Sequence, residues 1–150
     1  MRSIIFDSST IINLALNNLL WLLAPLRTQY KGTFRIPIDV KREIIDTPLR
    51  IKRFKLEALQ ILREITKGNL TVTTNPKIER ATQDLDALAN NIYFGKKKSI
   101  HIIDRGECNA LVLAKDITAD ALAIDERTTR LLIESPEALH QILQKKLRIP

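Results

Sequence analysis

The chain has 150 residues, of which 45% are apolar, and it carries a formal net charge of +7. This length predicts a single domain, residues 1–150, with enough apolar side chains for an ordinary hydrophobic core. The positive charge favours a polyanionic partner such as nucleic acid. The single cysteine excludes an internal disulfide and argues against a thiolate metal cluster, which fits a reducing environment. No apolar run is long enough to span a bilayer, so we expect no membrane partner and a cytoplasmic location.

Strand and helix patterns alternate along the chain. Apolar or alternating runs predict strands at 3–7, 34–37, 70–74 and 121–125. Apolar stripes at helical spacing predict helices at about 10–16, 19–26, 39–46, 51–67, 77–93, 106–117, 127–133 and 136–147. The runs SIIF and ALAI are almost wholly apolar, which is typical of strands in a parallel sheet covered on both faces. The sequence therefore predicts a three-layer α/β/α domain with a central parallel sheet.

Four carboxylates are expected near one edge of this sheet. Asp7 ends the first strand and Asp125 ends the last, and parallel strands end at the same edge, where ligands bind. Glu43 lies early in the helix that follows the second strand. Glu107 lies at the start of the helix GECNALVLA. We expect the four to form one acidic site.

Glu107 is the most informative of the four. Ala110, Leu111 and Ala114 follow it at helical spacing, so it shares the apolar face of its helix. A carboxylate on that face is costly unless a partner satisfies it, and no Lys or Arg stands at helical spacing there. A divalent cation would satisfy all four acids at once.

Each acid also has a simpler explanation when taken alone. Asp7 and Asp125 could be helix N-caps, a common role for Asp after a strand. Glu43 could be a solvated helix residue, and Glu107 could only interact with the helix dipole. The four together at one edge favour the functional explanation.

An all-oxygen site of this kind selects hard cations such as Mg²⁺ or Mn²⁺. Zinc would require His or Cys, and the two histidines, His101 and His140, are far apart in the sequence. We expect His101 to be a partly buried structural residue. A bound hard cation can activate water and neutralise a phosphate. Such a pocket inside a basic surface predicts phosphodiester cleavage.

The acidic segments resemble the motifs of the PIN-domain family of metal-dependent ribonucleases. IIFDSSTIINLA is similar to the opening motif, an apolar strand ending D-[ST]-[SN]. IDRGECNALVLA is similar to D-x-G-E-x-x-A-x-x-L-A, and LAIDERTTRLL to D-[DE]-x-x-x-R, while the glutamate of IPIDVKREII matches the second acid. This resemblance, over roughly residues 3–133, implies RNA hydrolysis and the strand order 3-2-1-4-5. It implies that Asp7, Glu107 and Asp125 bind the metal, with Glu43 as a further catalytic acid.

The family includes toxin nucleases of prokaryotic toxin–antitoxin pairs. The resemblance therefore also implies an antitoxin protein and a second copy of the chain as partners. The helix 136–147 extends beyond the core motifs and could serve dimerisation. Residues expected to support the acids are Ser9, Asp104, Glu126 and Arg130. Ser9 would hydrogen-bond within the metal site, and Asp104 would either join the site or help to start the helix of Glu107.

Two basic segments are candidates for RNA contact. They contain Lys96, Lys97 and Lys98 in an expected loop, and Arg50 and Arg53 near the start of a helix. Such runs are also commonly just a solvated face. Aromatic residues are scarce, so base-specific recognition is not visible in the sequence.

Two other functions are compatible with these residues. In an aspartyl phosphatase Asp7 would attack phosphorus directly, but those enzymes need a second acid two residues on, and this chain has Ser9 there. The non-enzymatic alternative is a basic α/β module that binds RNA or a protein partner without cutting, with structural acids.

Overall fold

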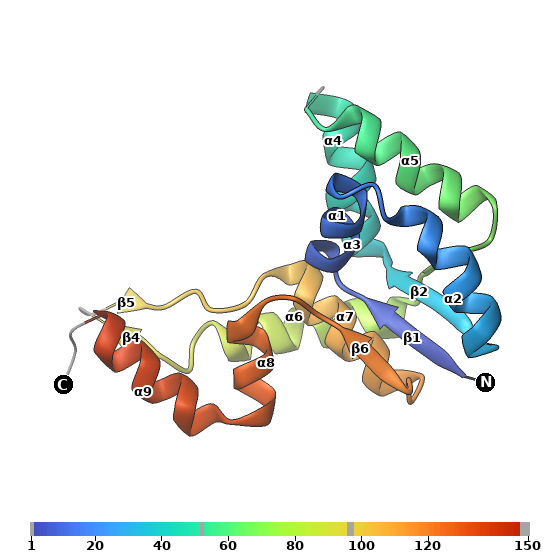
Figure 1. Cartoon of the computed structure of the whole chain (residues 1–150). Coiled ribbons are helices and arrows are strands. Elements are labelled where there is room, and N and C mark those ends of the chain that lie inside the picture. The colour runs from blue at the N-terminus through green and yellow to red at the C-terminus, as the bar shows by residue number, and fades with distance from the viewer. Residues whose placement is uncertain (1, 52, 96–97, 148–150) are drawn as a thin grey trace.

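A parallel sheet forms the centre of the computed structural model, which describes residues 2–51, 53–95 and 98–147 (Figure 1). The strands, in the order β3-β2-β1-β6, are β1 (Ser3–Phe6), β2 (Thr33–Pro37), β3 (Thr71–Thr73) and β6 (Ala121–Ala123). Ile5 of β1 pairs with Arg35 on one side and with Leu122 on the other, so β1 has a neighbour on both edges. The predicted α/β class and parallel sheet are confirmed.

The strand order 3-2-1-4-5 is wrong, because β6 is the outermost strand on its side of β1. The described chain after β6 is helical and forms α8 (Arg127–Glu134) and α9 (Pro136–Leu147). Apolar residues there recur at helical spacing, and Pro136 starts a helix, so no strand pattern is available for the fifth position. A short antiparallel pair, β4 (Phe94–Gly95) and β5 (Lys98–Ser99), stands apart from the sheet.

Helical segments fill most of the remaining chain. They are α1 (Ser8–Leu16), the 3₁₀ turn η1 (Leu20–Leu22), α2 (Leu23–Tyr30), α3 (Ile38–Lys41), the π-helical turn η2 (Arg42–Asp46), α4 (Thr47–Ile51), α5 (Lys55–Thr66), α6 (Pro76–Ala89) and α7 (Arg105–Asp116). The predicted helix 51–67 starts later, at Lys55, because Phe54 before it has a left-handed backbone with φ of 59°.

Both faces of the sheet are covered. Phe6 belongs to a core with residues of α1, α2, η2 and α5, whereas its neighbour Ile5 packs with Ile78 of α6 and Leu113 of α7. Successive side chains of a strand point to opposite faces, so these two cores lie on opposite sides of β1. The chain therefore has the three layers that its apolar strands predict.

A second lobe extends from this domain. Figure 1 shows α8, α9 and the β4–β5 pair to one side of the sheet. Its core contains Ile103 and Cys108, packed against Leu139 of α9 and Ala89 at the end of α6. Because α6 and α7 contribute to this core as well as to the sheet, they connect the lobe to the domain.

Within the described residues, no single helix is long and apolar enough to cross a bilayer. Taken together, α1 and the segment Leu20–Tyr30 have the length and apolar composition of a membrane span, but the two segments meet at a bend of 114°. In this structure α1 packs on the sheet through the buried residues Ile11 and Ala15.

Replacing Ile5 by Ala tests the importance of the central strand. Ile5 is fully buried, so we expect a loss of about 2–5 kcal/mol in the free energy of unfolding, measured by urea denaturation. The matched control is Ile51→Ala, at a side chain that is 62% exposed, with an expected change within about 0.5 kcal/mol. Equal losses for both variants would contradict this burial.

Candidate functional site

Asp7 lies directly after the central strand and is fully buried. It caps α1 by accepting a hydrogen bond from the backbone N–H of Ser9 at 3.2 Å, and the Ser9 hydroxyl donates a second at 2.6 Å. The Ser8 hydroxyl donates to the other carboxylate oxygen at 3.3 Å. The backbone N–H of Asp7 donates to the carbonyl of Ala123, which holds the residue against β6. Asp7 is therefore a helix cap, as one explanation predicted, and it also lies at the edge of the sheet where the acidic site was expected.

Glu43 reaches the same place from the π-helical turn η2. The residue is exposed, but its Oε2 lies so close to Gly106 in the first turn of α7 that a Cβ atom there would be 2.7 Å away. Burial of the carboxyl group raises the pKa of Glu43, the nearby Ser8 hydroxyl lowers it, and the charges of Asp7 and Asp104 raise it further. The carboxyl group of Glu43 is thus turned inward, towards other acids.

Glu107 is the third residue of α7, in its first turn, and is 8% exposed. Its Oε2 accepts a hydrogen bond of 2.9 Å from the backbone N–H of Asp104, which caps the helix. Burial raises the pKa of Glu107 most; the bond from Asp104 N–H lowers it, and the charge of Asp7 raises it. The nearby hydroxyl of Thr129, which is buried, also lowers the pKa of Glu107.

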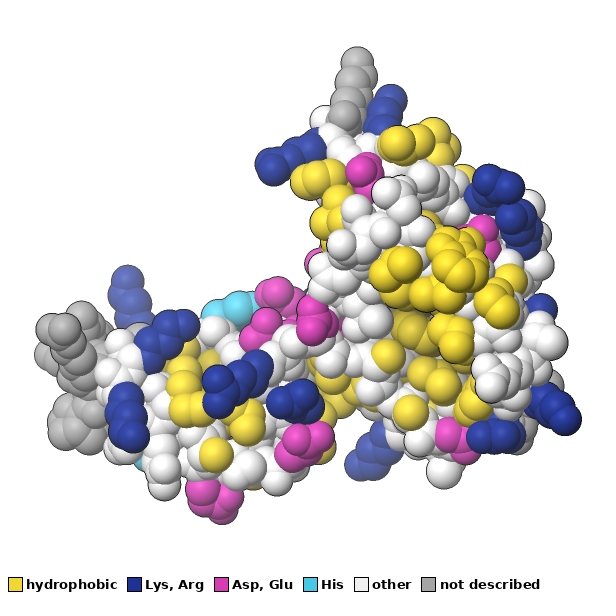
Figure 2. All heavy atoms as spheres, in the orientation of Figure 1, with side chains coloured by type: hydrophobic (Ala, Val, Ile, Leu, Met, Phe, Trp, Pro, Cys, Tyr) yellow, Lys and Arg dark blue, Asp and Glu magenta, His cyan; other side chains and the backbone are white. Residues whose placement is uncertain are grey.

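Asp7, Glu43 and Glu107 form what we call the acidic cluster. No ion pair among the described residues includes any of the three. Figure 2 shows other acidic side chains on the surface at the inner corner of the L-shaped molecule, whereas Asp7 and Glu107 are buried. Over residues 2–51, 53–95 and 98–147, however, no three His, Cys, Asp or Glu side chains are placed to hold one ion together. The cluster concentrates negative charge without a complete ligand set.

Asp125 lies outside the acidic cluster. It is exposed and accepts a hydrogen bond of 2.5 Å from the side-chain amide of Asn13 on α1. Glu126, not Asp125, caps α8 through a 3.1 Å bond from Thr128 N–H. Arg130 pairs with Glu134 at 3.6 Å on the same helix. The roles predicted for Asp125, Glu126 and Arg130 at a metal site have no support from these contacts.

The other predicted supporting residues lie close to the acids. Ser9 binds Asp7 as expected, and Asp104 both caps α7 and interacts electrostatically with Glu43 and Glu107. His101 is not the partly buried residue that the sequence suggested. Its side chain is 64% exposed, and Nε2 lies 2.8 Å from Oδ1 of Asp104.

The predicted RNA-contacting residues are dispersed. Lys96 and Lys97 lie outside the described residues. Lys98 is exposed on β5 and Arg50 on α4, while the Arg53 guanidinium stacks over Phe54 at 4.9 Å from the ring centroid. Since α4 belongs to the sheet domain and β5 to the second lobe, these cations do not form one patch (Figure 1).

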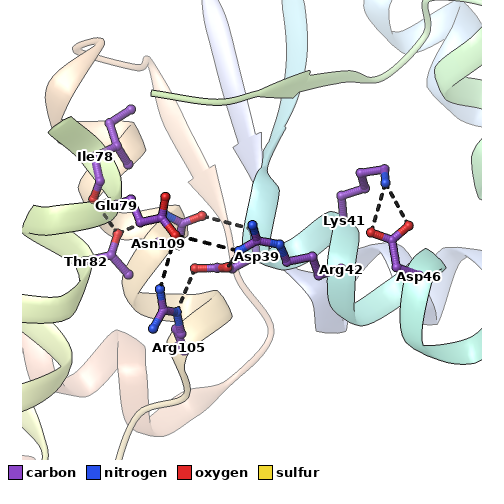
Figure 3. A network of polar contacts seen from close by, with 9 residues as sticks. All are labelled: Asp39, Lys41, Arg42, Asp46, Ile78, Glu79, Thr82, Arg105 and Asn109. Atoms are coloured by element: carbon purple, nitrogen blue, oxygen red, sulfur yellow. Dashed lines mark hydrogen bonds and ion pairs between the residues drawn. The ribbon is translucent and has the colours of Figure 1, made fainter. Parts of the chain in front are cut away.

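Sequence reasoning missed a second polar group on the other side of the α7 start, shown in Figure 3. Asp39 is 8% exposed and accepts hydrogen bonds from Arg42 Nη1 at 2.7 Å and from Arg105 Nε at 3.0 Å. Glu79 of α6 lies 3.9 Å from Arg42 and 3.7 Å from Arg105. The hydrogen bond to Asp39 raises the pKa of Arg105. We call Asp39, Arg42, Glu79 and Arg105 the Asp39 network.

Buried polar groups fix this network to the fold. The backbone N–H of Asp39 donates to Oδ1 of Asn109 on α7, and Nδ2 of Asn109 donates to the Thr82 hydroxyl on α6. Asn109 and Thr82 are almost fully buried. In the sequence, only the spacing of Asp39 and Arg42 by three residues could have suggested part of this arrangement.

Comparisons of the chain with protein-family models, with curated proteins and with solved structures found no match. The resemblance to PIN-domain nucleases therefore remains a prediction from sequence motifs.

Asp39→Asn tests the network. We expect it to lower the free energy of unfolding by about 1–3 kcal/mol, because hydrogen bonds from two charged partners to a buried carboxylate are weakened. Asp46→Asn is the matched control, since Asp46 pairs with Lys41 near the surface and such pairs contribute about 0–1 kcal/mol. A loss for Asp39→Asn no larger than that for Asp46→Asn would show that the network does not stabilise the fold.

Glu107→Gln tests the acidic cluster, because Gln stays neutral and keeps an acceptor for Asp104 N–H. The pKa of Glu107 is raised in the folded protein above its ordinary value of 4.5 in the unfolded chain. Its carboxyl group therefore stabilises the fold most below pH 4.5, and this contribution is lost as the pH rises through the raised pKa. Without metal, Glu107→Gln should therefore melt above the wild type at pH 7.5 and near it at pH 4. Glu137→Gln, at an exposed site on α9, should match the wild type at both. A Glu107→Gln protein that melts at or below the wild-type temperature at pH 7.5 would contradict the raised pKa.

Proposed function

We propose that the protein is a metal-dependent endoribonuclease that hydrolyses RNA phosphodiester bonds at the acidic cluster. The observation that carries this proposal is the convergence of Asp7, Glu43 and Glu107 on the start of α7 without a cation from the described chain. Such a concentration of negative charge disfavours the ionised acids, and a bound cation would relieve this repulsion.

The donors fit a hard divalent cation. Mg²⁺ commonly binds through one or two carboxylates and keeps several waters, so a group of three protein ligands is not required. Glu107 and Glu43 would hold Mg²⁺ or Mn²⁺, with Asp7 behind them. A cation bound there supplies charge neutralisation for the phosphate and a more acidic water.

The three acids differ in depth, and this suggests separate roles. Asp7 is fully buried and fixed by Ser8 and Ser9, so it contributes charge from the floor of the site. Glu107 is fixed by Asp104 N–H. Glu43 is the most exposed residue of the three, although its carboxyl group is turned inward, so an arriving phosphate would approach from its side of the site. The net charge of +7 would attract the RNA backbone.

The alternatives have less support. Direct attack by Asp7 on phosphorus would require a fully buried carboxylate to leave its hydrogen bonds with two serines. A basic module that binds RNA without cutting would not need unpaired acids whose charges act on one another at the start of α7. A role as a toxin with an antitoxin partner, and a homodimer, belong to the same proposal through the sequence resemblance.

Cleavage of a mixed-sequence single-stranded RNA with 5 mM Mg²⁺ or Mn²⁺ tests the function. We expect Glu107→Gln and Glu43→Gln to reduce cleavage by more than about 100-fold, because even the outer partners of metal ligands are worth about 10–100-fold. Asp125→Asn should reduce it by less than about 10-fold, since Asp125 contacts Asn13 instead of the cluster.

EDTA should abolish cleavage by the wild type, and added Mn²⁺ should restore it. Wild-type protein that binds RNA and leaves it intact with either metal would favour the non-catalytic module. An Asp125→Asn loss as large as that of Glu107→Gln would show that Asp125 joins the site in the working enzyme.

A further inference from the structure

A pocket of about 370 Å³ opens at the carboxyl ends of β2 and β3, next to the Asp39 network. Residues that line it include Ile38, Arg42, Asn75, Ile78, Glu79 and Asn109. In open parallel sheets this edge is where ligands bind. None of the three acids of the cluster lines the pocket, so it is a separate site at the same edge.

The pocket combines an apolar wall with a charged rim. Ile38 and Ile78 supply apolar surface, and Asn109, which is 1% exposed, lies at the back in hydrogen bonds to Asp39 and to Thr82. Arg42 and Glu79 stand at the rim, with side chains 52% and 45% exposed. An apolar slot with a few oriented polar groups is suited to a planar ring with hydrogen-bonding edges.

Both charged rim groups keep free bonding capacity. Arg42 uses one N–H on Asp39, and a guanidinium has five. Glu79 lies 3.9 Å from Arg42 and 3.7 Å from Arg105, which is too far for a hydrogen bond, so its oxygens can still accept. The Asp39 carboxylate fixes the Arg42 side chain in place before any ligand arrives.

The pocket is close enough to the acidic cluster to serve the same RNA strand. Arg42 and Glu43 are consecutive in η2, and Arg105 and Gly106 are consecutive in α7. The two groups therefore lie on neighbouring sides of the first turn of α7, within about one helix diameter of roughly 10 Å. Stacked nucleotides are spaced by about 3.4 Å along a strand. A base in the pocket would belong to a nucleotide a few positions from the bond cut.

We propose that this pocket, bounded by Arg42 and Glu79, binds one base of single-stranded RNA and prefers guanine. The inference rests on the proposed function, since it assumes that RNA is the substrate. Guanine presents acceptors O6 and N7, which suit an arginine, and donors on N1 and N2, which suit a carboxylate. Adenine and the pyrimidines do not present this combination of edges.

The experiment measures binding of ten-nucleotide oligo(U) strands with one central G, A, C or U to the Glu107→Gln protein, by fluorescence anisotropy. We expect the strand with G to bind about 5- to 100-fold more tightly than the others, the range of a good paired contact to a base edge. Glu79→Gln and Arg42→Lys in the same background should remove this preference while leaving binding of the U strand within about threefold.

The matched controls are Glu137→Gln and Arg50→Lys, at exposed sites away from the pocket, and they should keep the preference for G. Equal binding of all four strands, or a loss that is uniform across them in Glu79→Gln, would overturn the inference. If the wild type cuts no RNA but the Glu107→Gln protein still prefers the strand with G, the nuclease function is rejected and the guanine pocket is supported. If the wild type cuts RNA but no strand is preferred in binding, the nuclease function is supported and the guanine pocket is rejected.

Discussion

Burial of the Asp7 carboxylate at the end of the central strand is the constraint on which the rest of the site depends. A buried charge of this kind is tolerated only when hydrogen bonds replace its water. Ser8 and Ser9 supply these bonds because both lie in the first turn of the helix that Asp7 caps. The charge of Asp7 disfavours the ionised forms of Glu43 and Glu107. A strand end and a helix start thereby create a local excess of negative charge.

The first turn of α7 separates two kinds of acid. On one side, Asp39 is bound by Arg42 and Arg105, so its charge is compensated within the chain. On the other side, the acidic cluster has no such partner among the described residues. Gly106 lies at this boundary, and any larger residue would push against the Glu43 carboxyl group. The arginines are thus committed to the paired acid, which leaves the unpaired ones available to an external cation.

The sequence predicted most of the sheet but only part of the site. All four strands of the sheet follow from apolar or alternating runs, and the inward face of Glu107 follows from helical spacing. The fifth strand came from the family resemblance and had no run of its own. The contact of Arg105 with Asp39 joins residues 66 positions apart, so only tertiary structure reveals it. Glu43 depends on a π-helical turn, for which the sequence carries no clear signal.

The two polar groups around α7 impose different requirements on a polyanionic strand. The positive charge of the chain can bring RNA near, but until a cation is bound the acidic cluster repels phosphates, so overall charge cannot set the position of the scissile bond. The Asp39 network is balanced, with two arginines facing two acids, and it therefore neither attracts nor repels strongly. It can instead hold a strand through directed hydrogen bonds beside the repelling cluster. On this reasoning, recognition of a base is the physical means by which an acidic site could keep RNA in register.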